Sequence, residues 1–332
     1  MFIFNFRKLP KAFLLAVLII ITFESFVWIL DQRYYLSEVP TEGLRIKIKN
    51  RLSQASGNHF DVLIFGDCYP HLGIQPKIIE QRTGLTCYNF STYVWQTALS
   101  SYAMLRNYVQ HSSKPKVIIL SFNSWGAAFS KGDIFKERMP FFYEFAQGNE
   151  DIFIQEFGFA QGVKFAIPSV GKQEVLQKII RSPFHVSLGN PKAINDFIAT
   201  VQNDGGFDPS YMDAPYNYWR MTTQQYPLSL FFKRYVISIL ELAQKNNIPV
   251  IYLKPTLPQD YYEFEEKKYH VSELYNGFIA LLSNHYSNMI ILNPQEMLGD
   301  PVYYQSKQHL NRKGSLVLSE YLAAEIKNSR FK

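Results

Sequence analysis

Two hydrophobic patterns alternate along most of the chain. Short apolar runs, typical of strands buried on both faces, occupy about residues 60–65, 86–90, 117–122, 250–254 and 289–293. Between and after them, the pattern and the flanking residues predict helices at about residues 75–83, 96–110, 228–246, 265–283 and 312–328. Strands that alternate with helices predict a parallel sheet whose strands are joined by crossover helices.

Residues 124–225 interrupt this alternation after the third predicted strand. The segment is rich in Phe, Tyr, Gly, Pro and Asn, and it shows no regular strand–helix order. We expect an inserted cap of short helices here, one of them at Lys172–Ile180. Asn203–Pro209, where Asn, Asp and Gly cluster, is expected to be a loop.

The first apolar segment is of a different kind. Ala12–Leu30 contains thirteen Leu, Ile, Val or Phe residues among nineteen, and as a helix it would extend about 28 Å, close to one bilayer core. Each of these thirteen favours insertion by roughly 0.3–0.6 kcal/mol, which together outweigh a cost of at most about 3 kcal/mol for Glu24. We therefore expect an uncleaved transmembrane anchor at residues 12–30. A cleaved signal peptide is the alternative, although the segment is long for one and no small-x-small site follows it.

The charges around the anchor predict its orientation. Arg7, Lys8 and Lys11 precede it, so residues 1–11 are expected in the cytoplasm and the main domain in the periplasm or outside the cell. Residues 31–58 are a charged juxtamembrane segment, helical from about Thr41 to Ala55, and residues 59–332 are the main domain. The net charge of +6 is scattered, so we expect the membrane as a partner but no nucleic acid.

The chain has two cysteines, Cys68 and Cys87. A disulfide must be considered outside the cytoplasm. However, Cys68 follows the end of the first strand, whereas Cys87 begins the second. Since the Cα atoms should then be too far apart, we expect no disulfide.

Polar residues follow the first three predicted strands. Gly66-Asp67-Cys68 follows the first, Asn89 the second and Asn123 the third. In an open parallel sheet, ligands bind beyond the carboxyl ends of the strands, so these side chains are candidates for one site. A second motif, Ser306-Lys307-Gln308-His309-Leu310-Asn311 with Gly314, precedes the closing helix. The other six histidines lack such a context and are interpreted as solvated or structural.

Together these motifs resemble the SGNH/GDSL hydrolase superfamily over roughly residues 60–125 and 228–325. Gly66-Asp67-Cys68 is similar to the family's Gly-Asp-Ser, with cysteine in place of the nucleophilic serine. Gly73-Ile74-Gln75-Pro76 resembles the Gly-Ile-Asp-Pro of membrane-anchored members, and His309-Leu310-Asn311 resembles the final catalytic block. The resemblance implies a three-layer α/β/α fold with a flavodoxin-like parallel sheet, and ester hydrolysis or O-acyl transfer on a cell-envelope or extracellular glycan.

The resemblance also implies roles for individual residues. Cys68 would be the nucleophile and His309 the acid and base. Asn123 would donate its amide to the oxyanion, and Asn89 and Asp67 occupy other family positions. Ser306 stands where the family has aspartate, so Ser306, or Asp300 from the same loop, would orient the imidazole. A thiol is far more acidic than a hydroxyl, so a Cys–His pair depends less on that aspartate.

A catalytically inactive domain is the alternative to an enzyme. The two substitutions, Cys68 for serine and Ser306 for aspartate, would then mark a protein that binds a glycan or acyl carrier, or that serves a membrane-protein partner as a scaffold in polysaccharide assembly. No group of His, Asp and Glu has the spacing of metal ligands. We therefore expect neither a metal nor another cofactor.

Overall fold

The computed structural model describes residues 11–34, 40–93, 97–128, 130–132, 139–173, 176–177, 191–209, 212 and 228–328. Its centre is a parallel five-stranded sheet with the order β2-β1-β3-β4-β5. The strands are β1 (Val62–Gly66), β2 (Cys87–Asn89), β3 (Val117–Ser121), β4 (Val250–Leu253) and β5 (Met289–Leu292). All five predicted strands are therefore confirmed, each within a few residues of its predicted ends.

Alternate residues of each strand enter two separate hydrophobic clusters. Leu63 and Phe65 of β1 belong to one cluster, with α5 (Ala98–His111) and α14 (Leu230–Lys245). Val62 and Ile64 belong to the other, with α4 (Pro76–Thr83) and α18 (Arg312–Asn328). The sheet is therefore buried on both faces, as its continuous apolar strands require.

One predicted helix is divided in two. The sequence predicts a helix over 265–283, but the structure has α15 (Gln259–Tyr269) and α16 (Val271–His285). His270 between them has a φ of +48°, a left-handed conformation that an α-helix cannot continue through. The predicted single helix is therefore wrong at this residue.

Short helices occupy the described parts of residues 124–225. They are α6 (Ser124–Ala128), α8 (Met139–Ala146), α9 (Glu150–Phe157), α10 (Phe159–Ala166), α11 (Pro168–Gly171) and α13 (Pro191–Asn203). The helix expected at 172–180 lies mostly outside the described residues. The loop expected at 203–209 is confirmed, and its Gly205 carbonyl accepts a hydrogen bond from the Asn89 N–H at 2.8 Å.

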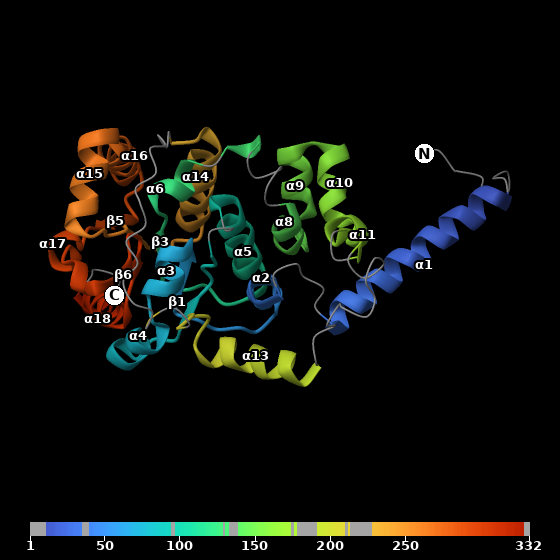
Figure 1. Cartoon of the computed structure of the whole chain (residues 1–332), viewed down its shortest axis with the longest axis horizontal. Coiled ribbons are helices and arrows are strands. Elements are labelled where there is room, and N and C mark those ends of the chain that lie inside the picture. Colours follow the sequence, from blue (N-terminus) through green and yellow to red (C-terminus); the bar gives the residue numbers. More distant parts are fainter. Residues whose placement is uncertain are drawn as a thin grey trace.

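Two N-terminal helices precede the sheet. α1 (Lys11–Tyr34) extends away from the rest of the chain (Figure 1), and Phe13–Asp31 is long and apolar enough to cross a membrane. α2 (Pro40–Gln54) packs against α5 and α8. Because Arg45, Lys47 and Lys49 of α2 are buried, this charged helix is part of the folded domain.

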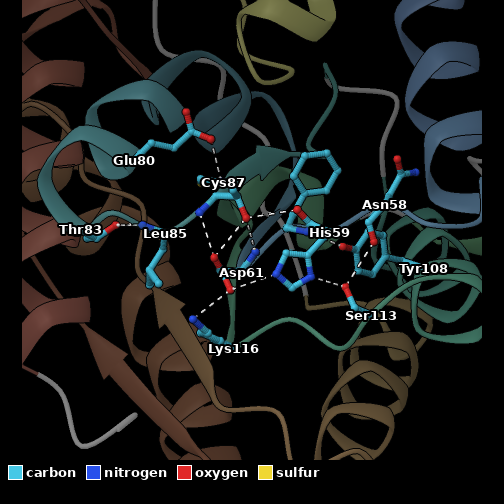
Figure 2. A network of polar contacts seen from close by, with 12 residues as sticks. Asn58, His59, Asp61, Glu80, Thr83, Leu85, Cys87, Tyr108, Ser113 and Lys116 are labelled. Atoms are coloured by element: carbon cyan, nitrogen blue, oxygen red, sulfur yellow. Dashed lines mark hydrogen bonds and ion pairs between the residues drawn. The ribbon is translucent and has the colours of Figure 1, made fainter.

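A polar network joins the amino ends of three strands (Figure 2). Asp61, just before β1, accepts hydrogen bonds from the Thr86 N–H at 3.0 Å and from its hydroxyl at 3.1 Å, and pairs with Lys116 at 3.1 Å. Against the effect of its burial, these contacts lower the pKa of Asp61. The network lies before β1, β2 and β3, at the edge of the sheet opposite the motifs predicted to carry chemistry.

The remaining elements form the C-terminal part of the candidate site. α3 (Cys68–Gly73) follows β1 directly, and α17 (Gln295–Leu298) follows β5. Next come a 3₁₀ turn at Pro301–Tyr303 and an antiparallel pair, β6 (Tyr304–Ser306) and β7 (His309–Leu310). α3 contacts β7, so the two motifs that are distant in sequence lie beside each other.

Candidate functional site

Cys68 and Asn123 meet at the carboxyl ends of β1 and β3. The register pairs Gly66 with Ser121, so the residues just beyond each strand are brought together. The Asn123 side-chain amide donates to Cys68 Sγ at 3.5 Å, and Asn123 Oδ1 accepts from the Gly126 N–H at 2.5 Å. The second contact fixes the amide with its NH₂ group toward the sulfur.

Asp67 links the two strand ends. Its carboxyl group caps α3 by accepting from the Tyr69 N–H at 3.1 Å, and it accepts from the Asn123 N–H at 2.7 Å. Burial raises the pKa of Asp67 to about 7, because a charge is disfavoured away from water. Asp67 therefore positions Cys68 and Asn123 through the backbone.

The Cys68 thiol is fully buried. Burial, and next the charge of Asp67, raise its pKa well above the ordinary value, against a smaller opposing effect of the Asn123 hydrogen bond. This direction is opposite to the depression that a thiolate–imidazolium pair requires. The thiol is therefore neutral at pH 7. Cys68 and Cys87 are both free, which confirms the expectation of no disulfide.

A tight hairpin positions His309. Ser306 at the end of β6 lies opposite His309 at the start of β7, and Ser306 Oγ is 3.1 Å from His309 Nδ1. Ser306, which stands where the resembled family has aspartate, is thus in contact with the imidazole. Asp300 instead caps the 3₁₀ turn by accepting from the Val302 N–H at 2.9 Å.

The second ring nitrogen of His309 is left open. Nε2 is enclosed and has no hydrogen-bond partner among the residues that the structure describes. Burial lowers the pKa of His309 to about 4, so the imidazole is neutral at pH 7. When Nδ1 carries the proton and donates to Ser306, Nε2 presents a lone pair and can accept a proton.

Asn89 is engaged in holding α3. Its side-chain amide donates to the carbonyls of Pro70 at 2.8 Å and Ile74 at 3.2 Å, and its oxygen accepts from the Ser91 N–H at 3.0 Å. Both amide hydrogens therefore serve backbone groups of the helix that begins with Cys68, and Asn89 is fully buried. In this arrangement Asn89 supports the site without presenting a donor to it.

A pocket opens beside Asn123. Its wall contains amide, aromatic and charged side chains: Asn123, Asn276, Asn293, Gln295, Gln308, Tyr262, Tyr275, Lys254 and Glu266. Gln308 precedes His309, so the pocket borders both halves of the predicted site. Amide groups both donate and accept hydrogen bonds, as a ligand rich in hydroxyl groups requires.

Most residues of this wall belong to none of the motifs in the sequence. Lys254 follows β4 and Asn293 follows β5, and both line the pocket. The rule that identified Asn123, a polar residue just beyond a parallel strand, would have found these two. Tyr262, Tyr275 and Asn276 come from α15 and α16, where no comparable signal exists.

A largely buried polar cluster lies beside α3 and corresponds to no motif in the sequence. It contains the buried Arg45 and Lys49 of α2, His71 of α3 and Asp208 after α13, together with the half-buried Glu42 of α2. Arg45 Nη2 is 3.1 Å from Asp208 Oδ1, and Lys49 Nζ is 3.3 Å from His71 Nδ1. Its members come from three distant segments, so no spacing along the chain could have predicted it.

Three members of this cluster have the chemistry of metal ligands. One ligand atom each from Glu42, His71 and Asp208 lies within 4.8 Å of the others. However, the Arg45 guanidinium already supplies positive charge beside Asp208, and the Lys49 amine already occupies the Nδ1 side of His71. We therefore interpret the cluster as a network of ion pairs and hydrogen bonds.

The chain matches no protein-family model and no curated protein.

Proposed function

We propose that this chain is a membrane-anchored SGNH-hydrolase-like protein that transfers or hydrolyses an O-acyl group on a cell-envelope or extracellular glycan. The contact of the Asn123 amide with Cys68 Sγ carries the proposal. It joins the expected nucleophile to the expected oxyanion donor. The strand order 2-1-3-4-5 and the burial of both sheet faces support the three-layer, flavodoxin-like fold that the resemblance implies.

The proposed mechanism starts from a neutral thiol and a neutral imidazole. His309 Nε2 has no hydrogen-bond partner among the described residues, so substrate binding has to bring it within reach of the Cys68 thiol. It then takes the thiol proton as Cys68 Sγ attacks the acyl carbonyl, and the carbonyl oxygen gains negative charge. The Asn123 amide stabilises this oxyanion. The carbon–oxygen bond to the leaving alcohol then breaks, and His309 returns the proton to that alcohol. A glycan hydroxyl, or water, then attacks the thioester while His309 Nε2 takes its proton. The carbon–sulfur bond breaks, and His309 passes this second proton to the sulfur, which restores the thiol.

The pocket supports a glycan as the acceptor. The amide side chains of Asn293 and Gln308 in its wall can pair with the hydroxyl groups of a sugar, whereas Gln295 and Tyr275 already bond the backbone of Leu257 and Phe122. Periplasmic or extracellular placement of the domain is proposed from Lys11 and the basic residues before α1, together with the apolar span Phe13–Asp31.

The experiment is acylation of the full-length protein in detergent. After incubation with p-nitrophenyl acetate, intact-protein mass spectrometry should detect one acetyl group, and peptide mapping should place it on Cys68. Cys68→Ala should remove it. Cys87 is equally buried and free, so Cys87→Ala is the matched control and should leave acylation unchanged. Labelling that persists in Cys68→Ala would overturn the role of this residue.

A second candidate is a catalytically inactive glycan-binding protein. The complete burial and raised pKa of the Cys68 thiol favour it. Under this proposal the wild-type protein acquires no acetyl group, yet glycan binding persists in Cys68→Ala and His309→Ala. Loss of binding on substitution of Asn276 or Gln308 would assign that binding to the pocket.

A further inference from the structure

Glu24 is an acidic residue within the apolar span of α1, and it has a partner in the cap. The Ser169 backbone N–H donates to Glu24 Oε2 at 2.9 Å, and the Ser169 hydroxyl donates to Glu24 Oε1. Ser169 belongs to α11, which contacts α1. Acidic side chains within a membrane span are rare and face protein partners.

The length of the span fixes the depth of this contact. Phe13–Asp31 has nineteen residues, about 28 Å as a helix, which matches a hydrocarbon core of about 30 Å. If the core ended at Glu24, residues 13–23 would cover only about 17 Å of it. The span cannot shift toward the N-terminus, because Lys11 and the basic residues before it are there.

Glu24 therefore lies about 10 Å inside the outer boundary of the span, seven residues before Asp31. Its hydrogen-bond partner Ser169 must lie at the same depth. A second contact gives the direction: Lys172 Nζ is 3.3 Å from Asp31 Oδ1. The chain from Ser169 to Lys172 thus runs outward beside the turns of α1 from Glu24 to Asp31.

The composition of α10 and α11 agrees with this placement. From Phe159 to Gly171 the sequence carries one charged residue, Lys164. Phe159 is 76% exposed, and Lys164 is also exposed and long enough to reach the headgroups. An apolar segment of this length is typical of a buried core helix or of a re-entrant or interfacial element. Phe165 packs in the core, and the exposed Phe159 on the same helix favours an interfacial element. In Figure 1, α11 lies beside α1, and α10 continues from it.

At this depth in the bilayer, the contact also satisfies a backbone group that hydrocarbon would leave unpaired. Ser169 is the second residue of α11, and the first N–H groups of a helix have no partner within it. An unpaired N–H in hydrocarbon costs several kcal/mol. The Glu24 carboxylate accepts this N–H, which explains why an acidic residue is present in the span.

We propose that α10 and α11 are immersed in the outer leaflet of the bilayer and contact phospholipid acyl chains, joined to α1 through Glu24 and Ser169. The inference rests on the proposal that α1 spans the membrane. It makes the cap a second membrane-embedded element of the protein.

The test is depth-dependent quenching on the full-length protein in phosphatidylcholine nanodiscs. A bimane label is attached through Phe159→Cys, at an exposed position. Ile20→Cys, on the exposed surface of α1 at 59%, is the membrane control, and Leu281→Cys, on α16 at 69% exposure, is the matched aqueous control. The native cysteines are buried, and their background is measured on unsubstituted protein.

Phosphatidylcholine with a doxyl group on its acyl chain should quench the label at position 159 several-fold more strongly than the label at position 281. The quenching at position 159 should be close to the quenching at position 20. Aqueous iodide should quench in the reverse order. If the label at position 159 is quenched as weakly by lipid as the label at position 281, while the label at position 20 is quenched strongly, the inference is overturned. The proposal that α1 spans the membrane is then retained. If 20 also escapes lipid quenching, the proposed membrane span is overturned, and the inference with it.

Discussion

Folding shifts the pKa values of Asp67 and His309 in opposite directions, and the two shifts affect stability over a similar range of pH. The folded pKa of Asp67 is raised to about 7 from an unfolded value of about 4. The folded state therefore keeps a proton that the unfolded state loses, and this contribution to stability falls as pH rises from 4 to 7. The folded pKa of His309 is lowered to about 4 from about 6.5. Its contribution falls as pH drops from 6.5 to 4, so the two trends partly cancel.

His309→Gln should remove one of the two trends. The variant keeps a polar side chain next to Ser306, but it cannot take up a proton as the pH falls. Relative to the wild type, its free energy of unfolding should increase by on the order of 2 kcal/mol between pH 7 and pH 4. Urea denaturation at pH 7, 5.5 and 4 measures this, with the exposed His285→Gln as the control. Parallel curves for His309→Gln and the wild type would contradict it.

The meeting of Cys68 and Asn123 could be predicted because both follow neighbouring parallel strands, and the carboxyl ends of such strands share one edge. The protonation of Cys68 could not. It depends on burial by residues distant in sequence, and the charge of Asp67 acts with that burial to raise the thiol pKa. The contact between Ser306 and His309 depends on the β6–β7 hairpin. With three residues in β6 and two in β7, these strands are too short to show a periodic pattern in the sequence.

The turn from β1 into α3 depends on the absence of a side chain at Gly66. Its φ is +151°, and an added Cβ would lie 1.8 Å from the Ser121 carbonyl oxygen. That oxygen belongs to β3, the strand paired with β1, and cannot move without breaking the sheet. The glycine of the Gly-Asp-Cys motif is therefore required by the close approach of two strands.

Gly66→Ala should destabilise the protein by roughly 4 kcal/mol or more, a loss that requires severe steric overlap. Gly84→Ala is the matched control: its φ is +75°, but an added Cβ would meet nothing within 4 Å. Backbone strain alone should then cost about 1–2 kcal/mol. Chemical denaturation of the two variants separates the cost of steric overlap from that of backbone strain. Equal losses of unfolding free energy would show that the close approach of Gly66 to Ser121 does not account for the destabilisation.

Elements with a strong pattern were predictable, and those fixed by tertiary contacts were not. All five strands lie near their predicted positions because apolar runs are distinctive. In α2, by contrast, Lys47 and Lys49 alternate with Ile46 and Ile48, which gives no single apolar face. The helix is nevertheless buried, because acidic partners in other elements, such as Asp31 of α1, neutralise its charges. A single sequence contains no sign of such pairing.

The helix α1 and the rest of the chain are joined by a buried ionic cluster. Asp31 near the end of α1 contacts Lys47 of α2, and Lys172 lies 3.3 Å from Asp31 and also contacts Glu144 of α8. All four side chains are buried. The acidic residues overcome the effect of burial and raise the pKa of Lys172. The sequence predicted the span but not this junction, which holds α1, α2 and α8 in one arrangement.

Lys172→Met should therefore weaken the whole assembly. The substitution leaves the buried carboxylates of Asp31 and Glu144 with Lys47 as the remaining lysine of the cluster. Removing one partner from a buried ion pair typically costs about 3–5 kcal/mol of unfolding free energy. Arg82→Met is the control, because Arg82 pairs with Glu320 on the surface, where both side chains are more than 40% exposed and such a pair is worth at most about 1 kcal/mol. Thermal unfolding of both variants in nanodiscs should show a clearly larger loss for Lys172→Met. A loss no greater than that of Arg82→Met would mean that the cluster does not hold α1 to the rest of the chain.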